Sequence, residues 1–146
     1  MFSVTAKAHF DSAHFLSGYV GKCANIHGHR WVVEAEVCGN LNDSGEEREM
    51  VADFSKVRDA LFQIAEDFDH VFVYENGTIS EELEEALYNE KFAVCAVPFR
   101  PTAENFALHF YVLLKDRKFD VSRVTVWETP ETSATYRPIK NEVYEF

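Results

Sequence analysis

Two segments in which apolar and polar residues alternate strictly constrain the fold most. In residues 2–10 one side of the chain carries Phe2, Val4, Ala6, Ala8 and Phe10. The alternation returns in residues 27–39, where one side carries His27, His29, Trp31, Val33, Ala35 and Val37. A period of two places successive side chains on opposite faces of a strand. We therefore expect two half-buried strands that are joined by a glycine-containing loop and pair antiparallel.

Two amphipathic helices are indicated by apolar residues at steps of three and four. The segment DFSKVRDALFQIAEDF begins at Asp53, a plausible N-cap, and its apolar residues are Phe54, Val57, Leu61, Ile64, Ala65 and Phe68. In PFRPTAENFALHFYVLLKDR we expect Thr102 to cap the second helix. Its buried stripe is then Phe106, Phe110, Leu113 and Leu114.

The remaining segments complete an α+β pattern. A short acidic helix is expected over residues 80–89, with Thr78 and Glu81 as a capping box. FAVCAV and VSRVTVWET read as strands, and SATYRPI starts a last one. This order predicts an antiparallel sheet with two long helices packed on one face. No repeat or linker interrupts the chain, so residues 1–146 are expected to form one domain.

Composition excludes several classes of protein. The net charge is −11, which makes the chain a poor general binder of nucleic acid or of an anionic membrane. No apolar run reaches the about 20 residues that span a bilayer. We see no signal peptide in MFSVTAKAHF, and three cysteines cannot form a disulfide framework. A cytoplasmic location is therefore expected.

The stretch KCANIHGHRW carries the strongest chemical signal. His27 and His29 leave the same face of their strand, and His14 lies at the end of the strand expected to pair with it. Three imidazoles suit Zn²⁺ and leave a fourth position open, as in catalytic sites. Cys23 could close that position, act as a nearby thiolate base or nucleophile, or be a small buried apolar residue. The alternative for the histidines is an incidental H-x-H in a chain with six histidines.

Two motifs that contain a carboxylate are weaker indications of an active site than the histidine cluster. Asp69 and His70 in DFDH offer a carboxylate and an imidazole for proton transfer, although adjacent side chains usually diverge and a solvated helix end is the alternative. Glu128 in VTVWETPE continues the alternation of the strand, so it falls on the same face as the apolar residues before it. It could accept two adjacent N–H groups of a planar heterocycle, or lie past the core at the rim of the sheet.

Taken together, these motifs resemble the 6-pyruvoyl-tetrahydropterin synthase superfamily over nearly the whole chain. The matching stretches, in order, are His14, CANIHGH, VADFSKVR, DFDH, PTAEN and WETP. The three residues between Cys23 and His27 are similar to the spacing of the bacterial 6-carboxy-tetrahydropterin synthases of queuosine biosynthesis. The resemblance implies the tunnelling fold, in which subunits associate into a barrel, commonly a hexamer of two trimers with active sites at subunit interfaces.

The resemblance also implies a reaction. 7,8-Dihydroneopterin triphosphate would be converted into 6-carboxy-5,6,7,8-tetrahydropterin, acetaldehyde and triphosphate. Cys23 would remove a proton, and Asp69 and His70 of a neighbouring subunit would form a proton relay. The other implied roles are zinc ligands for His14, His27 and His29, and pterin binding for Glu128, Thr102 and Glu104. Pyruvoyl formation by triphosphate elimination, and a non-catalytic zinc or pterin-binding module, remain open alternatives.

Overall fold

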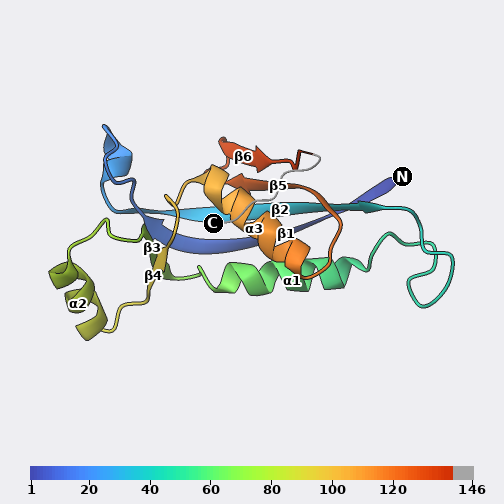
Figure 1. Cartoon of the computed structure of the whole chain (residues 1–146), viewed down its shortest axis with the longest axis horizontal. Helices are drawn as coiled ribbons and strands as arrows, with labels where there is room; N and C mark the ends of the chain where they lie inside the picture. Colours follow the sequence, from blue (N-terminus) through green and yellow to red (C-terminus); the bar gives the residue numbers. More distant parts are fainter. Residues whose placement is uncertain (140–146) are drawn as a thin grey trace.

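The computed structural model describes residues 1–139 and contains one six-stranded sheet in the order β4-β3-β1-β2-β5-β6 (Figure 1). The strands are β1 (Phe2–His14), β2 (His27–Gly39), β3 (Val71–Glu75), β4 (Val94–Val97), β5 (Val121–Trp127) and β6 (Ser133–Tyr136). The helices are α1 (Phe54–Glu66), α2 (Glu81–Asn89) and α3 (Ala103–Asp116), and a 3₁₀ turn, η1, covers Lys22–Ala24.

The two alternating segments form the centre of the sheet. β1 and β2 pair antiparallel without a register shift, from Phe2 opposite Gly39 to His14 opposite His27. The strand expected over residues 2–10 therefore continues to His14. β5 and β6 add further antiparallel pairs beside β2, which confirms that part of the expected sheet.

The sheet as a whole is mixed rather than antiparallel. β3, which the sequence reading did not assign, pairs parallel with β1 and with β4. Parallel neighbours need a crossover connection, and α2 provides it between β3 and β4. The short acidic helix and the strand after it are thus the second half of a β-α-β unit whose first strand was missed.

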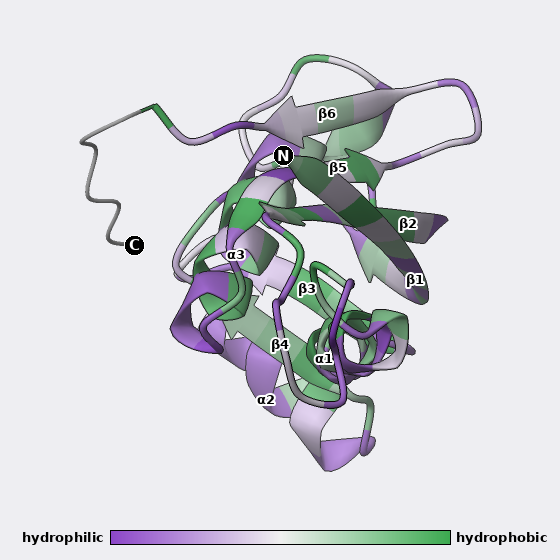
Figure 2. Cartoon of the chain, turned by 90° about the vertical axis from the view of Figure 1, so that its right-hand side faces the viewer, coloured by the Kyte–Doolittle hydropathy of each residue, from purple (hydrophilic) through white to green (hydrophobic). Residues whose placement is uncertain are grey.

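The two long helices cover one face of the sheet, as predicted (Figures 1 and 2). α1 packs on β1, while α3 packs on β5 and β6. Asp53 and Thr102 are the N-caps, accepting hydrogen bonds from the backbone N–H groups of Ser55 and Asn105. The core between the layers is aromatic: Phe10 is fully buried and contacts Trp31, Phe68, Phe106 and Phe110.

The predicted capping box before α2 is wrong. Ser80 is the N-cap, and its hydroxyl accepts from the N–H of Leu83 at 3.2 Å. Thr78 instead donates its hydroxyl hydrogen to the carbonyl of Glu75 at 2.6 Å. The reason is local: Thr78 closes the turn after β3, so its side chain is already occupied two residues before the N-cap Ser80.

The expected domain of residues 1–146 ends outside the described residues, since the structure describes the chain to residue 139. Within that range, no helix combines the length and apolar character needed to cross a membrane.

Candidate metal and pterin site

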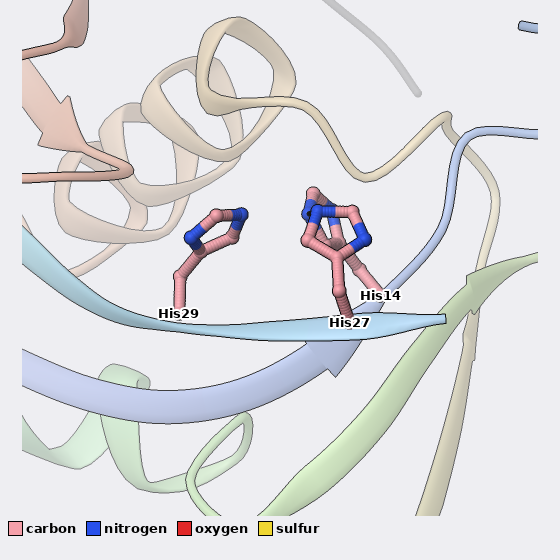
Figure 3. Close-up of side chains that lie close together, drawn as sticks. All are labelled: His14, His27 and His29. Carbon is pink, nitrogen blue, oxygen red and sulfur yellow. Dashed lines mark hydrogen bonds between the residues drawn. The ribbon is translucent and has the colours of Figure 1, made fainter. Parts of the chain in front are cut away.

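Three imidazoles converge on one point at the end of the β1–β2 pair. His14, His27 and His29 rise from the same side of the two strands (Figure 3). Each offers one ring nitrogen, and these nitrogens lie within 4.8 Å of one another. The side shared by Phe10 and Trp31 faces the helices, so the cluster lies where the apolar core opens toward solvent.

Backbone carbonyls orient two of the rings. His14 donates from Nδ1 to the carbonyl oxygen of Pro101 at 2.7 Å, and His27 donates from Nδ1 to that of Asn25 at 2.7 Å. A carbonyl can only accept, so each Nδ1 carries the hydrogen and each Nε2 keeps its lone pair. The two Nε2 atoms lie 3.1 Å apart. Two lone pairs at that separation require a cation or a proton between them.

Burial lowers the pKa of two of the three imidazoles. Desolvation lowers the pKa of His14 to about 4, against a smaller raising effect from Pro101. The pKa of His29 is also lowered, chiefly by burial, while the nearby Glu128 carboxylate opposes this shift. Neutral imidazole is the form that binds metal. The Nε2 atom of His29 is buried and has no hydrogen-bond partner in residues 1–139. These residues therefore fit a divalent cation well.

Glu128 lies beside this cluster. It follows the last residue of β5, so it is at the rim of the sheet, and its side chain is only 28% exposed. Its Oε1 is 3.6 Å from Nε2 of His29. Glu128 and Glu104 also line one small cavity of about 180 Å³. The rim interpretation is correct, but the carboxylate still faces the site.

Asp69 and His70 form a hydrogen-bonded dyad, although they are adjacent in sequence. The Nδ1 atom of His70 is 2.8 Å from Oδ2 of Asp69. Both residues are fixed on β1: the N–H of Asp11 donates to Asp69 Oδ1 at 2.8 Å, and the N–H of His70 donates to the carbonyl of Asp11 at 2.6 Å. His70 has φ of 57°, a left-handed conformation that is uncommon for residues other than glycine. This turn lets neighbouring side chains meet.

The dyad is a polar, exposed pair. The side chain of His70 is 80% exposed. Hydrogen bonding to Asp69 raises the pKa of His70. The backbone N–H of Asp11, followed by His70, lowers the pKa of Asp69. His70 and His29 both line a groove of about 670 Å³ between the end of β1 and α2. The dyad thus faces a space in which a ligand could lie.

The remaining predicted residues are placed as follows. Cys23 lies in η1, half-buried, and its thiol forms no hydrogen bond with another described residue. Thr102 caps α3, which occupies an oxygen lone pair of its hydroxyl. Glu104 is exposed in the first turn of the same helix. Within residues 1–139, no hydrogen bond joins Cys23 to Asp69 or His70, so one copy of the chain does not connect these three residues.

A family comparison agrees with this geometry. The family model described as 6-pyruvoyl tetrahydropterin synthase matches residues 3–139. The chain belongs to this family.

Relatives in this synthase family carry a more specific name. The chain is 35% identical over 140 residues to a protein of Haemophilus influenzae named 6-carboxy-5,6,7,8-tetrahydropterin synthase, covering 94% of the chain and 99% of that protein. It is 36% identical over 130 residues to an Aquifex aeolicus protein of the same name, covering 81% of the chain and 77% of that protein.

Solved structures of the synthase family have the same fold. The 6-pyruvoyl tetrahydropterin synthase of Plasmodium falciparum superposes with a TM-score of 0.71 at 19% identity, covering 94% of this chain and 97% of that one. The expected tunnelling fold and its α+β class are thereby confirmed.

Sequence reasoning missed the groups that orient the imidazoles. The carbonyl of Pro101 reaches His14 across 87 positions, and backbone carbonyls carry no residue-type signal. Trp31 was seen only as an apolar strand residue. Its fully buried ring stands edge-on against His14 and His29, with centroids 4.9 and 5.4 Å away, and forms the apolar floor of the site.

Proposed function

We propose that this chain is a zinc-dependent 6-carboxy-5,6,7,8-tetrahydropterin synthase of queuosine biosynthesis. It converts 7,8-dihydroneopterin triphosphate and water into 6-carboxy-5,6,7,8-tetrahydropterin, acetaldehyde and triphosphate. The observation that carries the proposal is the convergence of three imidazoles whose ring nitrogens lie within 4.8 Å of one another, in a chain 35% identical over nearly its whole length to a protein of that name. Zinc is proposed because three imidazoles are a typical donor set for catalytic Zn²⁺.

His14, His27 and His29 would hold the ion through ring nitrogens whose lone pairs face one another. When bound, zinc supplies Lewis-acid polarisation of substrate oxygen atoms. The buried Trp31 ring closes the inner side of the site, so a substrate must enter from the rim of the sheet.

Cys23 and the dyad are the proposed proton-transfer groups. The Cys23 thiol is half-buried and free of hydrogen bonds to other described residues, so as thiolate it can accept a proton from substrate carbon. The Nδ1 atom of His70 is held by Asp69, so Nε2 is the atom through which His70 exchanges a proton with substrate. Asp69 favours the charged imidazole and thereby stabilises the protonated form of the relay.

Glu128 is the proposed pterin anchor. Its carboxylate is at the rim, 28% exposed, and beside His29. Two carboxylate oxygens can accept two adjacent N–H groups of a planar heterocycle in parallel. Glu104 lines the same small cavity, and the Thr102 hydroxyl, which accepts from Asn105, keeps its hydrogen for donation to the ligand.

The proposed assembly is a homo-oligomer, a hexamer of two trimers, with each site shared between subunits. Two observations support it. β3 pairs with β1 only at Ser12 and Ala13, so in the described chain the earlier residues of β1 have no strand partner on that side, and an open edge favours pairing with another copy. The exposed dyad also lies apart from Cys23, so a second copy would complete the site. The three free cysteines agree with a cytoplasmic location.

The proposal is tested by incubating the zinc-loaded protein with 7,8-dihydroneopterin triphosphate and measuring acetaldehyde and the pterin product. Release of triphosphate without acetaldehyde would instead indicate pyruvoyl formation. Binding without any product would indicate a pterin-binding module. Cys23→Ala should keep its zinc and lose turnover by about 100-fold or more, whereas Cys38→Ala should retain turnover. Normal cleavage by Cys23→Ala would refute the assignment of the base.

Sharing of the site between subunits has its own test. Cys23→Ala and His70→Ala proteins, each inactive alone, are dissociated, mixed and reassembled. If one subunit supplies Cys23 and its neighbour supplies His70, mixed oligomers contain some intact sites and recover part of the activity. Mixtures that stay inactive, although light scattering and tagged subunits show that mixed oligomers formed, would contradict shared sites.

A further inference from the structure

Arg100 lies where the histidine cluster meets the loop that carries Cys23. The next residue, Pro101, accepts the Nδ1 hydrogen of His14 through its carbonyl. The side chain of Arg100 turns the other way and donates from Nη2 to the carbonyl of Ser17 at 2.9 Å. Two adjacent residues therefore contact both parts of the proposed active site.

In residues 1–139, the other hydrogen bonds of the loop between β1 and η1 stay within the loop and η1, and the Phe15 ring at the start of the loop contacts Phe72 of β3. The N–H of Leu16 donates to the carbonyl of Cys23 at 2.8 Å, and the N–H of Tyr19 donates to that of Leu16 at 3.3 Å. Within residues 1–139, the bond from Arg100 to Ser17 is the one hydrogen bond that links residues 17–21 to a segment outside the loop. The Arg100 guanidinium also lies over the Tyr19 ring, 6.0 Å from its centroid, a cation–π distance.

The backbone of Arg100 is itself held by two hydrogen bonds. Its carbonyl accepts hydrogen bonds from the N–H of Thr102 at 2.8 Å and from Nδ2 of Asn105 at 2.9 Å. Its side chain is half-buried, Nε is buried without a hydrogen-bond partner, and no carboxylate of the described chain forms an ion pair with it. A partly desolvated cation without a carboxylate is costly, so folding stability alone does not account for arginine here.

We propose that Arg100 is a positioning residue that fixes the Cys23 loop relative to the metal ligand His14. It contacts neither reacting atoms nor metal; it acts through Ser17 and Tyr19. The catalytic part of this inference rests on the proposed function of Cys23. The positional part is measured without turnover, so the two can fail separately.

The first measurement uses Arg100→Gln. Loss of the Arg100–Ser17 hydrogen bond frees the loop, so the Cys23 thiol should react with iodoacetamide about tenfold faster. A tenfold change corresponds to the free energy of about one charged hydrogen bond. Peptide mass spectrometry follows each cysteine separately, and Cys38 and Cys95 in the same sample should react at the wild-type rate. Hydrogen exchange at the Leu16 amide, whose bond to Cys23 closes the loop, should accelerate by a similar factor.

The second measurement separates positioning from general damage. Thr102 and Asn105 still hold the backbone at position 100, so the Pro101 carbonyl stays on His14. Zinc affinity of Arg100→Gln should therefore remain within about twofold of wild type, well short of the 10- to 100-fold loss typical of an outer-shell partner. Arg117→Gln is the matched control: Arg117 also donates to a backbone carbonyl, that of Ala60, but should leave Cys23 reactivity unchanged.

In the turnover assay, Arg100→Gln should lower kcat about tenfold with little change in KM, because a misplaced base affects the chemical step. Arg100→Lys keeps one hydrogen-bond donor and a cation for the Tyr19 ring. It should therefore recover part of kcat and part of the protection of Cys23 from iodoacetamide.

If Arg100→Gln does not fold, Tyr19→Leu removes the ring under the guanidinium and should raise Cys23 reactivity in a folded chain. Wild-type Cys23 reactivity in the folded variants, or an equal rise at all three cysteines, would overturn the proposal. An inactive wild type would refute the function instead, and leave the alkylation result standing.

Discussion

The Nε2 atoms of His14 and His27 lie 3.1 Å apart across the last residue pair of the β1–β2 ladder. Each ring already donates its Nδ1 hydrogen to a backbone carbonyl, so the facing nitrogens are both acceptors. The fold therefore brings two ring nitrogens within reach of a single ion. A metal ion that binds this preformed site of the folded chain should stabilise the fold, so metal binding and folding should be coupled.

Removing one imidazole should abolish tight zinc binding. His27→Ala leaves two nitrogen ligands, and zinc affinity should fall by about 100-fold or more, beyond the loss seen for outer-shell partners. Isothermal titration of chelator-treated protein measures this. His9→Ala is the control, because His9 is exposed on the opposite face of β1. Equal zinc affinity of His27→Ala and wild type would eliminate the site.

Acid should destabilise the metal-free protein through His14. Its pKa is about 4 in the folded chain against 6.5 for the ordinary residue, so at intermediate pH the unfolded state binds a proton that the folded state does not. Stability from this group is present above pH 6.5 and is lost as pH falls toward 4. Between pH 8 and pH 5 the loss is roughly 2 kcal/mol. Urea unfolding should show this dependence in wild type, and a flatter one in His14→Gln; parallel curves would contradict it.

The dyad should titrate as an interacting pair. Asp69 raises the pKa of His70, so the imidazolium persists above pH 6.5. The contribution of the pair to folding stability is lost as pH rises through the pKa of His70 in the folded chain. NMR titration of the His70 ring should give a midpoint above 6.5 that returns toward 6.5 in Asp69→Asn. Asp59→Asn, which removes an exposed carboxylate paired with Arg58, should not move it. A midpoint unchanged in Asp69→Asn would disprove the coupling.

Stability should depend strongly on the aromatic centre of the core. Phe10 is fully buried among four aromatic rings, so Phe10→Ala removes its contacts and leaves a cavity. The expected loss of unfolding free energy is about 3–5 kcal/mol. Phe62→Ala on α1, where the side chain is 46% exposed, should cost much less. Chemical denaturation compares the two, and similar losses would refute the proposed core.

Regions with a repeating pattern were predicted well. The alternation in residues 2–10 and 27–39 correctly predicted two paired strands, and the apolar steps around Leu61 and Phe110 correctly predicted the two long helices. β3 was missed although the shorter β4 and β6 were predicted, and its parallel pairing depends on a β-α-β crossover. The cap of α2 was misassigned because Thr78 and Ser80 are equally plausible caps in sequence, and only the turn after β3 occupies one of them.

The alternating patterns establish which residues share a face: period two places His27 and His29 together, and antiparallel pairing adds His14. The orientation of these side chains follows from packing between elements. The carbonyl of Pro101, the ring of Trp31 and the guanidinium of Arg100 come from different segments or carry no pattern of their own. Local periodicity reports only the direction of side chains along one element. Tautomer, desolvation and loop position depend on contacts between elements, which form only when the chain is packed.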